Sequence, residues 1–468
     1  MKFMMWTASM LAAAIASGAA ADPPLAKPND RSGLYDAKTQ TTNDLRRLPV
    51  APGTNVPKTN IFITNARLFD GTGVPVRAVD LLIQGDKLVR VGEPGGEPPE
   101  GAEVIDARGR TVMPGLIDLH THLTYVHAFG LPAPLSEESQ AGAAIRGAER
   151  LRYYAESGIT SVRDVASHGM APFLLKEEVA SGAIPGPRIF AAGQLIVGEG
   201  GHGTEYYALS TAPGYAEAAV REASGPDEWR AAVRANFKSG ADLIKLASHF
   251  NQEEVDAAVD EAHRLGLRVT VDSETIYTRM AVDAGVDSIE HPLPRSAETV
   301  TLMAKKGIAS VPTFVPYQYI NSGGGYNGST SRRFTISDER MFALGAEMKA
   351  AGVKLGVGTD VTLDGHHYLP EVYVQELRNF RRLGYSASQA LVAATLTNAE
   401  ILGMDDRLGT LQPGKLADLI IVDGKPDQDI EDLKKVDLVI VGGRIIVRDG
   451  RAILPPRIEE KAPFTSAK

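Results

Sequence analysis

The chain has 468 residues, a formal net charge of −9 and no cysteine. This length allows a large core and two domains, and the negative charge argues against nucleic acid as a partner. Without cysteine there is no disulfide, thiol nucleophile or thiolate ligand, so any metal must be held by histidine, carboxylate or a modified lysine.

Both ends of the chain lack the periodicity of folded elements. Lys2 supplies a positive charge, residues 3–15 are apolar, and residues 16–21 are small. This pattern predicts a secretory signal peptide over 1–21, with an uncleaved anchor as the alternative. We therefore expect an exported protein, periplasmic or secreted, with no membrane span after cleavage. Residues 22–57 predict an irregular N-terminal arm, and 457–468 a C-terminal tail.

Short strands separated by Gly-Asp and Asp-Gly turns fill residues 58–112, and the same style returns over 407–456. Such pairs of residues are typical of hairpins. We expect the two segments to form one small β-sandwich domain built from both ends of the chain.

Residues 113–406 alternate apolar strands with helical segments, which indicates an α/β fold with a parallel sheet. The expected strands are 116–122, 159–165, 188–195, 242–248, 267–272, 286–291, 308–314 and 353–360. Eight such repeats predict a (β/α)8 TIM-type barrel, whose chemistry lies at the C-terminal strand ends. A doubly wound sheet competes, but no Gly-x-Gly-x-x-Gly follows a strand.

The first strand of this series ends in two histidines, His120 and His122. Alternate side chains of a strand share a face, so the two imidazoles point the same way. Converging imidazoles at a strand end favour a divalent metal site.

Polar residues also mark four later strand ends. Lys245 lies inside an apolar run, where a lysine is costly unless it is paired or modified. The other three residues end their strands: Asp272, His291 and Asp360. Residues at barrel strand ends converge on one mouth, and core packing does not explain such a set.

The set without Asp272 resembles the amidohydrolase superfamily, in its imidazolonepropionase-like and prolidase-like group of metal-dependent hydrolases. It consists of His120, His122, Lys245, His291 and Asp360. The phrases that carry the resemblance are Met-Pro-Gly-Leu-Ile-Asp-Leu-His-Thr-His, Ala-Gly-Val-Asp-Ser-Ile-Glu-His and Gly-Thr-Asp. It implies that His120, His122 and Asp360 hold one divalent metal, with zinc as the expected ion. Lys245, carboxylated by carbon dioxide, would bridge to a second metal that His291 also binds.

The chain departs from the family pattern at the fifth strand, where Asp272 stands in place of an expected histidine. Three interpretations stay open. Asp272 binds the second metal through a carboxylate oxygen, or that metal is lost and the site is mononuclear, or the enzyme is impaired.

Four residues follow strands and are candidates for contact with the substrate. His202 lies in a Gly-Gly-His-Gly loop and is a candidate catalytic residue that hydrogen-bonds a substrate carbonyl or carboxylate. The candidate substrate-binding residues are His249, Tyr317 and His366.

The expected reaction is hydrolysis of a C–N amide bond by metal-activated water, with Asp360 as general base. The substrate is expected to be a small amide, such as a dipeptide or N-acyl amino acid. A cyclic-amide hydrolase or a deaminase is an alternative, and so is a metal-binding homologue that has lost activity. The sequence leaves a homo-oligomer open.

Overall fold

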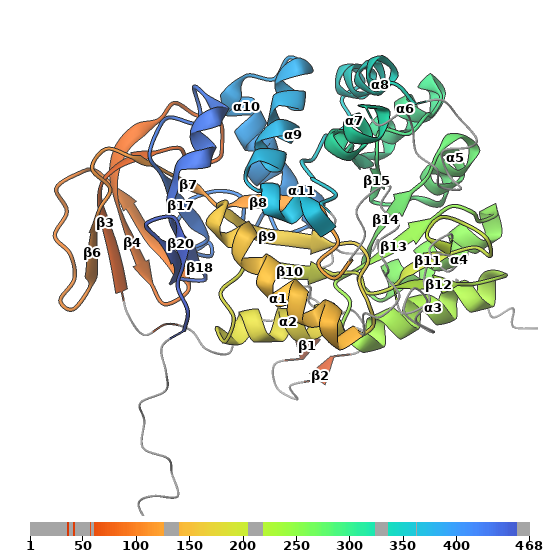
Figure 1. Ribbon diagram of the computed structural model, residues 1–468, viewed down its shortest axis with the longest axis horizontal. Helices are drawn as coiled ribbons and strands as arrows, with labels where there is room; N and C mark the ends of the chain where they lie inside the picture. Colours follow the sequence, from red (N-terminus) through yellow and green to blue (C-terminus); the bar gives the residue numbers. More distant parts are fainter. Residues whose placement is uncertain are drawn as a thin grey trace, which may run out of the picture.

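The computed structural model has strands and helices in a mixed α/β arrangement (Figure 1). It describes residues 35–36, 41–42, 57, 60–125, 140–204, 219–322, 336–361 and 363–455. The predicted signal peptide over 1–21, most of the arm over 22–57 and the tail over 457–468 lie outside these residues. Within them, no helix has both the length and the apolar character needed to span a membrane.

Strands from both ends of the chain form one nine-stranded sheet, at the left of Figure 1. Its hydrogen-bonded path runs β20-β19-β18-β17-β7-β3-β4-β5, and β6 pairs with β3. The strands are β3 (Asn60–Leu68), β4 (Arg77–Gln84), β5 (Lys87–Gly92), β6 (Glu103–Asp106), β7 (Thr111–Pro114), β17 (Leu419–Val422), β18 (Val436–Val441), β19 (Arg444–Arg448) and β20 (Arg451–Ala452). Strands from the two ends of the chain pair in one sheet, as expected. The folding of this sheet into a two-layered β-sandwich stays a prediction. A separate pair, β1 (Tyr35–Asp36) and β2 (Thr41–Thr42), is antiparallel.

Two parallel sheets follow, with the orders β10-β9-β8 and β12-β11-β13-β14-β15-β16. Their strands are β8 (Leu116–Thr121), β9 (Ile159–Asp164), β10 (Arg188–Ala191), β11 (Leu195–Val197), β12 (Val220–Glu222), β13 (Leu243–Ala247), β14 (Arg268–Asp272), β15 (Ser288–Glu290) and β16 (Ala309–Val311). The predicted strand 188–195 is divided between β10 and β11. The predicted strand 308–314 ends early because α7 begins at Phe314.

Backbone contacts join the three-stranded sheet, at both of its edges, to the six-stranded sheet. On one side the Asp242 amide, just before β13, donates to the Ala191 carbonyl of β10 at 2.8 Å. On the other side the segment 355–361 makes parallel bridges to both sheets, Leu355 with Ser310 and Val361 with Thr121. Strand 353–360 of the prediction is therefore present as isolated bridges rather than as a regular strand.

Helices alternate with these strands. They are α1 (Gln140–Glu156), α2 (Ala171–Ser181), α3 (Pro226–Ser239), α4 (Gln252–Arg264), α5 (Thr275–Ala284), α6 (Ala297–Lys306), α7 (Phe314–Ser322), α8 (Asp338–Ala350), α9 (Glu371–Arg382), α10 (Ala387–Val392) and α11 (Asn398–Leu402), with 3-10 turns η4 (Leu363–Tyr368) and η6 (Ile430–Lys435) and a π turn η5 (Ala393–Thr397). The start of α4 illustrates the local cause. Asn251 accepts from the Glu254 amide at 3.0 Å, and the Glu254 carboxylate accepts from the Asn251 amide at 2.8 Å, which is a capping box.

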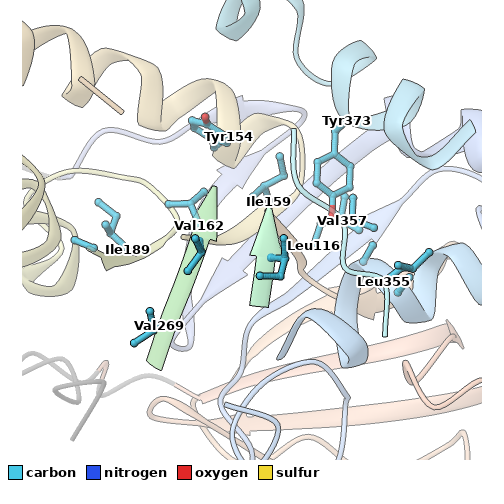
Figure 2. Close-up of a cluster of buried hydrophobic side chains, with 14 of the residues drawn as sticks. Leu116, Tyr154, Ile159, Val162, Ile189, Val269, Leu355, Val357 and Tyr373 are labelled. Carbon is cyan, nitrogen blue, oxygen red and sulfur yellow. The ribbon is translucent and has the colours of Figure 1, made fainter. Parts of the chain in front are cut away.

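The main apolar core lies between the strands and the helices that follow them. Side chains of β8, β9, β10 and β14 and of the segment 355–357 contribute to it, and Tyr154 of α1 and Tyr373 of α9 close it from the helix side (Figure 2). The Tyr373 hydroxyl donates to the Ile117 carbonyl at 2.7 Å. This core fixes the strand ends from which the functional side chains project.

A carboxyl group buried in this shell gives a stability prediction. Burial raises the pKa of Glu376 to about 8, although its oxygens accept from the Phe314 and Val315 amides at 2.9 and 3.0 Å. Because the folded pKa exceeds the unfolded value, the stabilisation is fully present below the unfolded pKa and is lost as pH rises towards 8. Glu376→Gln should remove this loss, which amounts to about 1.4 kcal/mol per pH unit at most.

The measurement is urea denaturation of metal-free wild type and variant at pH 5 and pH 8. The wild type should lose more free energy of unfolding than the variant between the two pH values. An equal loss in both proteins would contradict the prediction.

Candidate metal centre

Three side chains from two segments that are distant in the sequence meet at the carboxyl end of β8. The ligand atoms of His120, His122 and Asp360 all lie within 4.8 Å of one another. Asp360 Oδ1 is 3.3 Å from His122 Nε2 and 3.6 Å from His120 Nε2. These spacings are longer than good hydrogen bonds, but they match the separation of roughly 3.4 Å between ligand atoms around a tetrahedral zinc ion. The set therefore fits a divalent cation.

The backbone holds Asp360 against the two histidines. The Asp360 amide donates to the His120 carbonyl at 2.8 Å. Gly358 permits this approach, because a Cβ there would lie 2.9 Å from His120 Cβ. Asp118 fastens the same segment by accepting from the Thr359 amide at 2.9 Å and from its hydroxyl at 2.6 Å. Asp360 itself has a left-handed φ of 51°, a strained conformation of the kind found at functional sites.

Contacts at Nδ1 orient both imidazoles. His120 Nδ1 is 2.6 Å from Glu290 Oε2, and His122 Nδ1 is 2.9 Å from the Ala166 carbonyl. When Nδ1 carries the proton and donates it, Nε2 keeps its lone pair. Both Nε2 atoms are the ones that face Asp360, so the rings present their ligand nitrogens to a common point.

A second group surrounds Asp272 at the end of β14. Asp272 Oδ2 is 3.3 Å from His202 Nε2 and 3.3 Å from His291 Nε2, which is again ligand spacing rather than good hydrogen-bond spacing. Asp272 Oδ1 is buried without a hydrogen-bond partner among the described residues. His291 has a left-handed φ of 63°, and its Nδ1 is 2.8 Å from Thr313 Oγ1. A bound cation would satisfy the buried carboxylate.

Lys245 of β13 lies among these groups and is only 3% exposed. Burial lowers the pKa of its amine, although Glu290 and Asp272 act in the opposite direction. No described carboxylate forms an ion pair with it. The lowered pKa favours the neutral amine, which is the form that can react with an electrophile such as carbon dioxide.

The directions of the pKa shifts of the candidate ligand side chains are consistent with metal binding. Burial opposes ionisation of Asp360, but the neighbouring histidines outweigh it and hold its pKa well below the ordinary value. Burial also opposes ionisation of Asp272, but His291 and His202 outweigh this effect and lower its pKa. Burial and nearby Lys245 lower the pKa of His120. Ionised carboxylates and neutral imidazoles are the forms that bind metals.

Comparison with known proteins agrees with this geometry. A family model described as the amidohydrolase family matches residues 111–446. The chain belongs to this family. Its members are metal-dependent, and this amidohydrolase is a hydrolase that acts on C–N bonds.

Its relatives include enzymes of several specificities. Imidazolonepropionase from Geobacillus kaustophilus (strain HTA426) is 25% identical over 394 residues, which cover 75% of this chain and 85% of that protein. The structure of a Xaa-Pro dipeptidase with methionine bound in its active site is 30% identical, has a TM-score of 0.74, and covers 83% of this chain and 99% of its own. A prolidase complexed with N-methylphosphonate-L-proline is 28% identical, with a TM-score of 0.71 and coverage of 84% and 100%.

The remaining predicted residues of this amidohydrolase lie at different places. The Tyr317 ring centroid is 5.4 Å from that of His291, beside the second group. The His249 ring lies 5.3 Å from Tyr277. His366, a candidate substrate-binding residue, is fully buried and packs edge-on against Tyr154 of α1, with ring centroids 5.6 Å apart. The substrate contacts of all three residues stay predictions.

Sequence reasoning gave no role to the groups behind the ligands. Glu290 contacts His120, Asp118 fastens the segment that carries Asp360, and Thr313 supports His291. One signal was available, since Asp118 and Glu290 are carboxylates in strands whose residues are all buried, where an ionisable group needs a partner.

Proposed function

We propose that this amidohydrolase cleaves the amide bond of a dipeptide or N-acyl amino acid, with zinc as its metal. The observation that carries the proposal is the paired spacing at the strand ends. Asp360 Oδ1 lies 3.3 and 3.6 Å from the Nε2 atoms of His122 and His120, and Asp272 Oδ2 lies 3.3 Å from His291 Nε2. The spacing suits two cations at neighbouring positions, each with a carboxylate and at least one imidazole as ligands.

His120, His122 and Asp360 would hold the first ion, and Asp272, His291 and carboxylated Lys245 the second. Bound divalent ions of this kind lower the pKa of water and polarise a carbonyl. Carboxylation would turn the unpaired buried cation of Lys245 into an anion, which gives a physical reason for lysine at this position. A carboxylate at Asp272 adds negative charge to the second site relative to the histidine that the family pattern has there.

The chain's own residues carry the proton transfers. Asp360 is ionised and lies in the first group, so it can accept the proton of the attacking water as general base. Once protonated, it donates to the nitrogen of the leaving group. His202 lies beside Asp272 and would donate a hydrogen bond to the substrate carbonyl or carboxylate. Tyr317, next to His291, His249 and His366 are the proposed substrate contacts.

The choice of a peptide-like substrate rests on two supports. Two of the structural neighbours with 28–30% identity are a prolidase and a Xaa-Pro dipeptidase, and carboxylation would explain buried Lys245. The imidazolonepropionase relatives favour a cyclic amide as the second candidate. A deaminase is less favoured because it would not be expected to use a lysine at this strand.

We also infer that eight segments form the predicted barrel, with β11 and β12 as additional strands of the six-stranded sheet. The eight are β8, β9, β10, β13, β14, β15, β16 and segment 353–360. The backbone bond from Asp242 to Ala191 and the bridges of Leu355 and Val361 support closure at both edges. Export to the periplasm or outside the cell is proposed from residues 1–21 alone.

Metal content per chain, measured by elemental mass spectrometry after expression with zinc and bicarbonate, tests the proposal. We expect about two ions per chain and hydrolysis of Xaa-Pro dipeptides or N-acyl amino acids that a chelator abolishes and zinc restores. One ion with activity would support the mononuclear alternative, and Asp272→His should then raise the content to two. Absence of amide hydrolysis at full metal loading, with dipeptides, acyl amino acids and cyclic amides, would overturn the proposal.

A further inference from the structure

A buried ionic network lies directly behind His120, inside the strands. Glu290 of β15 and Arg163 of β9 are 0% and 3% exposed, and Arg163 NH2 is 2.7 Å from Glu290 Oε1. We propose that Glu290, held by Arg163, is a positioning residue that fixes His120 in the Nδ1-protonated tautomer and so reserves Nε2 for the metal. The proposal rests on the proposed metal role of His120.

The two oxygens of Glu290 have separate tasks. Oε1 accepts from Arg163, from the Thr270 hydroxyl, and from the Ser288 hydroxyl at 3.4 Å. Oε2 is paired with His120 Nδ1 at 2.6 Å. Because Oε1 is saturated by donors, the carboxylate cannot rotate to another partner without loss of buried hydrogen bonds. His120 is therefore held to a single orientation.

Arg163 links the carboxylate to the strand that carries the histidines. Its Nε donates to the Leu119 carbonyl at 2.5 Å, one residue before His120, and its NH1 donates to Ser288 Oγ at 3.2 Å. One guanidinium thus joins β8, β9 and β15. A buried pair of this kind is a weak source of stability, so its geometric effect on the site is the better explanation of its presence.

His120 and His122 differ in the group that is paired with Nδ1. His122 Nδ1 is paired with the neutral Ala166 carbonyl at 2.9 Å, whereas His120 Nδ1 is paired with a carboxylate. A carboxylate partner makes the ring a stronger ligand than a carbonyl does. Loss of the Nδ1 partner should therefore weaken metal binding more at His120 than at His122.

The test compares Glu290→Gln with Glu376→Gln, which makes the same change at a buried carboxylate away from the ligands. Zinc affinity is measured by competition with a chelator on apo-protein. Glu290→Gln should bind zinc roughly 10- to 100-fold more weakly, and Glu376→Gln should bind like wild type. Equal affinity of Glu290→Gln and wild type would overturn the proposal.

A second measurement needs neither a variant at Glu290 nor bound metal. Nitrogen NMR of apo-protein labelled at histidine reports which ring nitrogen carries the proton, and the His120 signal is assigned by its loss in His120→Gln. We expect a protonated Nδ1. A protonated Nε2 would overturn the proposal, while a failure to bind any metal would count against the proposed function and leave the tautomer result standing.

Discussion

Asp360→Asn should lower kcat/KM at least about 1,000-fold, because one carboxylate supplies both a ligand oxygen and the proton acceptor. General base catalysis alone accounts for roughly 100- to 10,000-fold. Asparagine retains the size of the side chain but cannot accept the proton. The Asp360 amide would still bond to the His120 carbonyl, so the fold should remain intact.

The measurement is steady-state hydrolysis of the best dipeptide, together with metal content and circular dichroism of the variant. Asp427→Asn is the matched control, since it makes the same change at a carboxylate that pairs with Arg67 at 2.7 Å in the terminal sheet. It should keep nearly full activity. An Asp360→Asn enzyme with more than a tenth of wild-type kcat/KM would remove Asp360 from the role of general base.

Lys245→Met should have opposite effects on activity and on stability. Methionine has a similar length and no charge. The variant therefore removes the free-energy cost of burying the lysine amine, and this burial is what lowers the pKa of Lys245. The metal-free variant should gain roughly 1–4 kcal/mol in free energy of unfolding, the range found when buried ion pairs are replaced by well-packed apolar side chains. Without a carboxylated lysine the second ion should be lost, and kcat/KM should fall at least about 100-fold.

Denaturation of chelator-treated protein and metal analysis of loaded protein provide the two readouts. Lys176→Met serves as the control, because Lys176 pairs with Asp242 at 2.5 Å and its loss should destabilise the protein without affecting metal content. If Lys245→Met is instead less stable than wild type when both are metal-free, Lys245 acts as an ordinary structural cation.

The sequence predicted which polar side chains lie at the strand ends better than it predicted the residues around them. Alternation along a strand was enough to pair His120 with His122, and the rule that barrel chemistry lies at strand ends was enough to add His291 and Asp360. The approach of His202 to Asp272 depends on how a glycine-rich loop folds back onto a neighbouring strand. A Cβ on Gly201 would lie 2.5 Å from the His249 amide, a constraint that local pattern does not reveal.

The backbone conformation of three residues at the site could not be predicted from the sequence either. His291, Thr313 and Asp360 all have left-handed φ angles, of 63°, 44° and 51°. None is glycine, and threonine is β-branched, so propensity argues against this conformation at each position. Tertiary contacts impose it, such as the bonds of Asp360 to His120 and of His291 to Val311. Such contacts join strands that lie far apart in the sequence.

The sheet built from both ends of the chain has a consequence for biosynthesis. β7 (Thr111–Pro114) pairs with β17 (Leu419–Val422), which is synthesised about 300 residues later. At ribosomal rates of about 5–20 residues per second, that strand edge stays unpaired for roughly 15–60 s. An open edge is a template for wrong pairing between nascent chains. The nascent protein should therefore depend on chaperones until its last strands emerge, and truncation before β17 should yield aggregates.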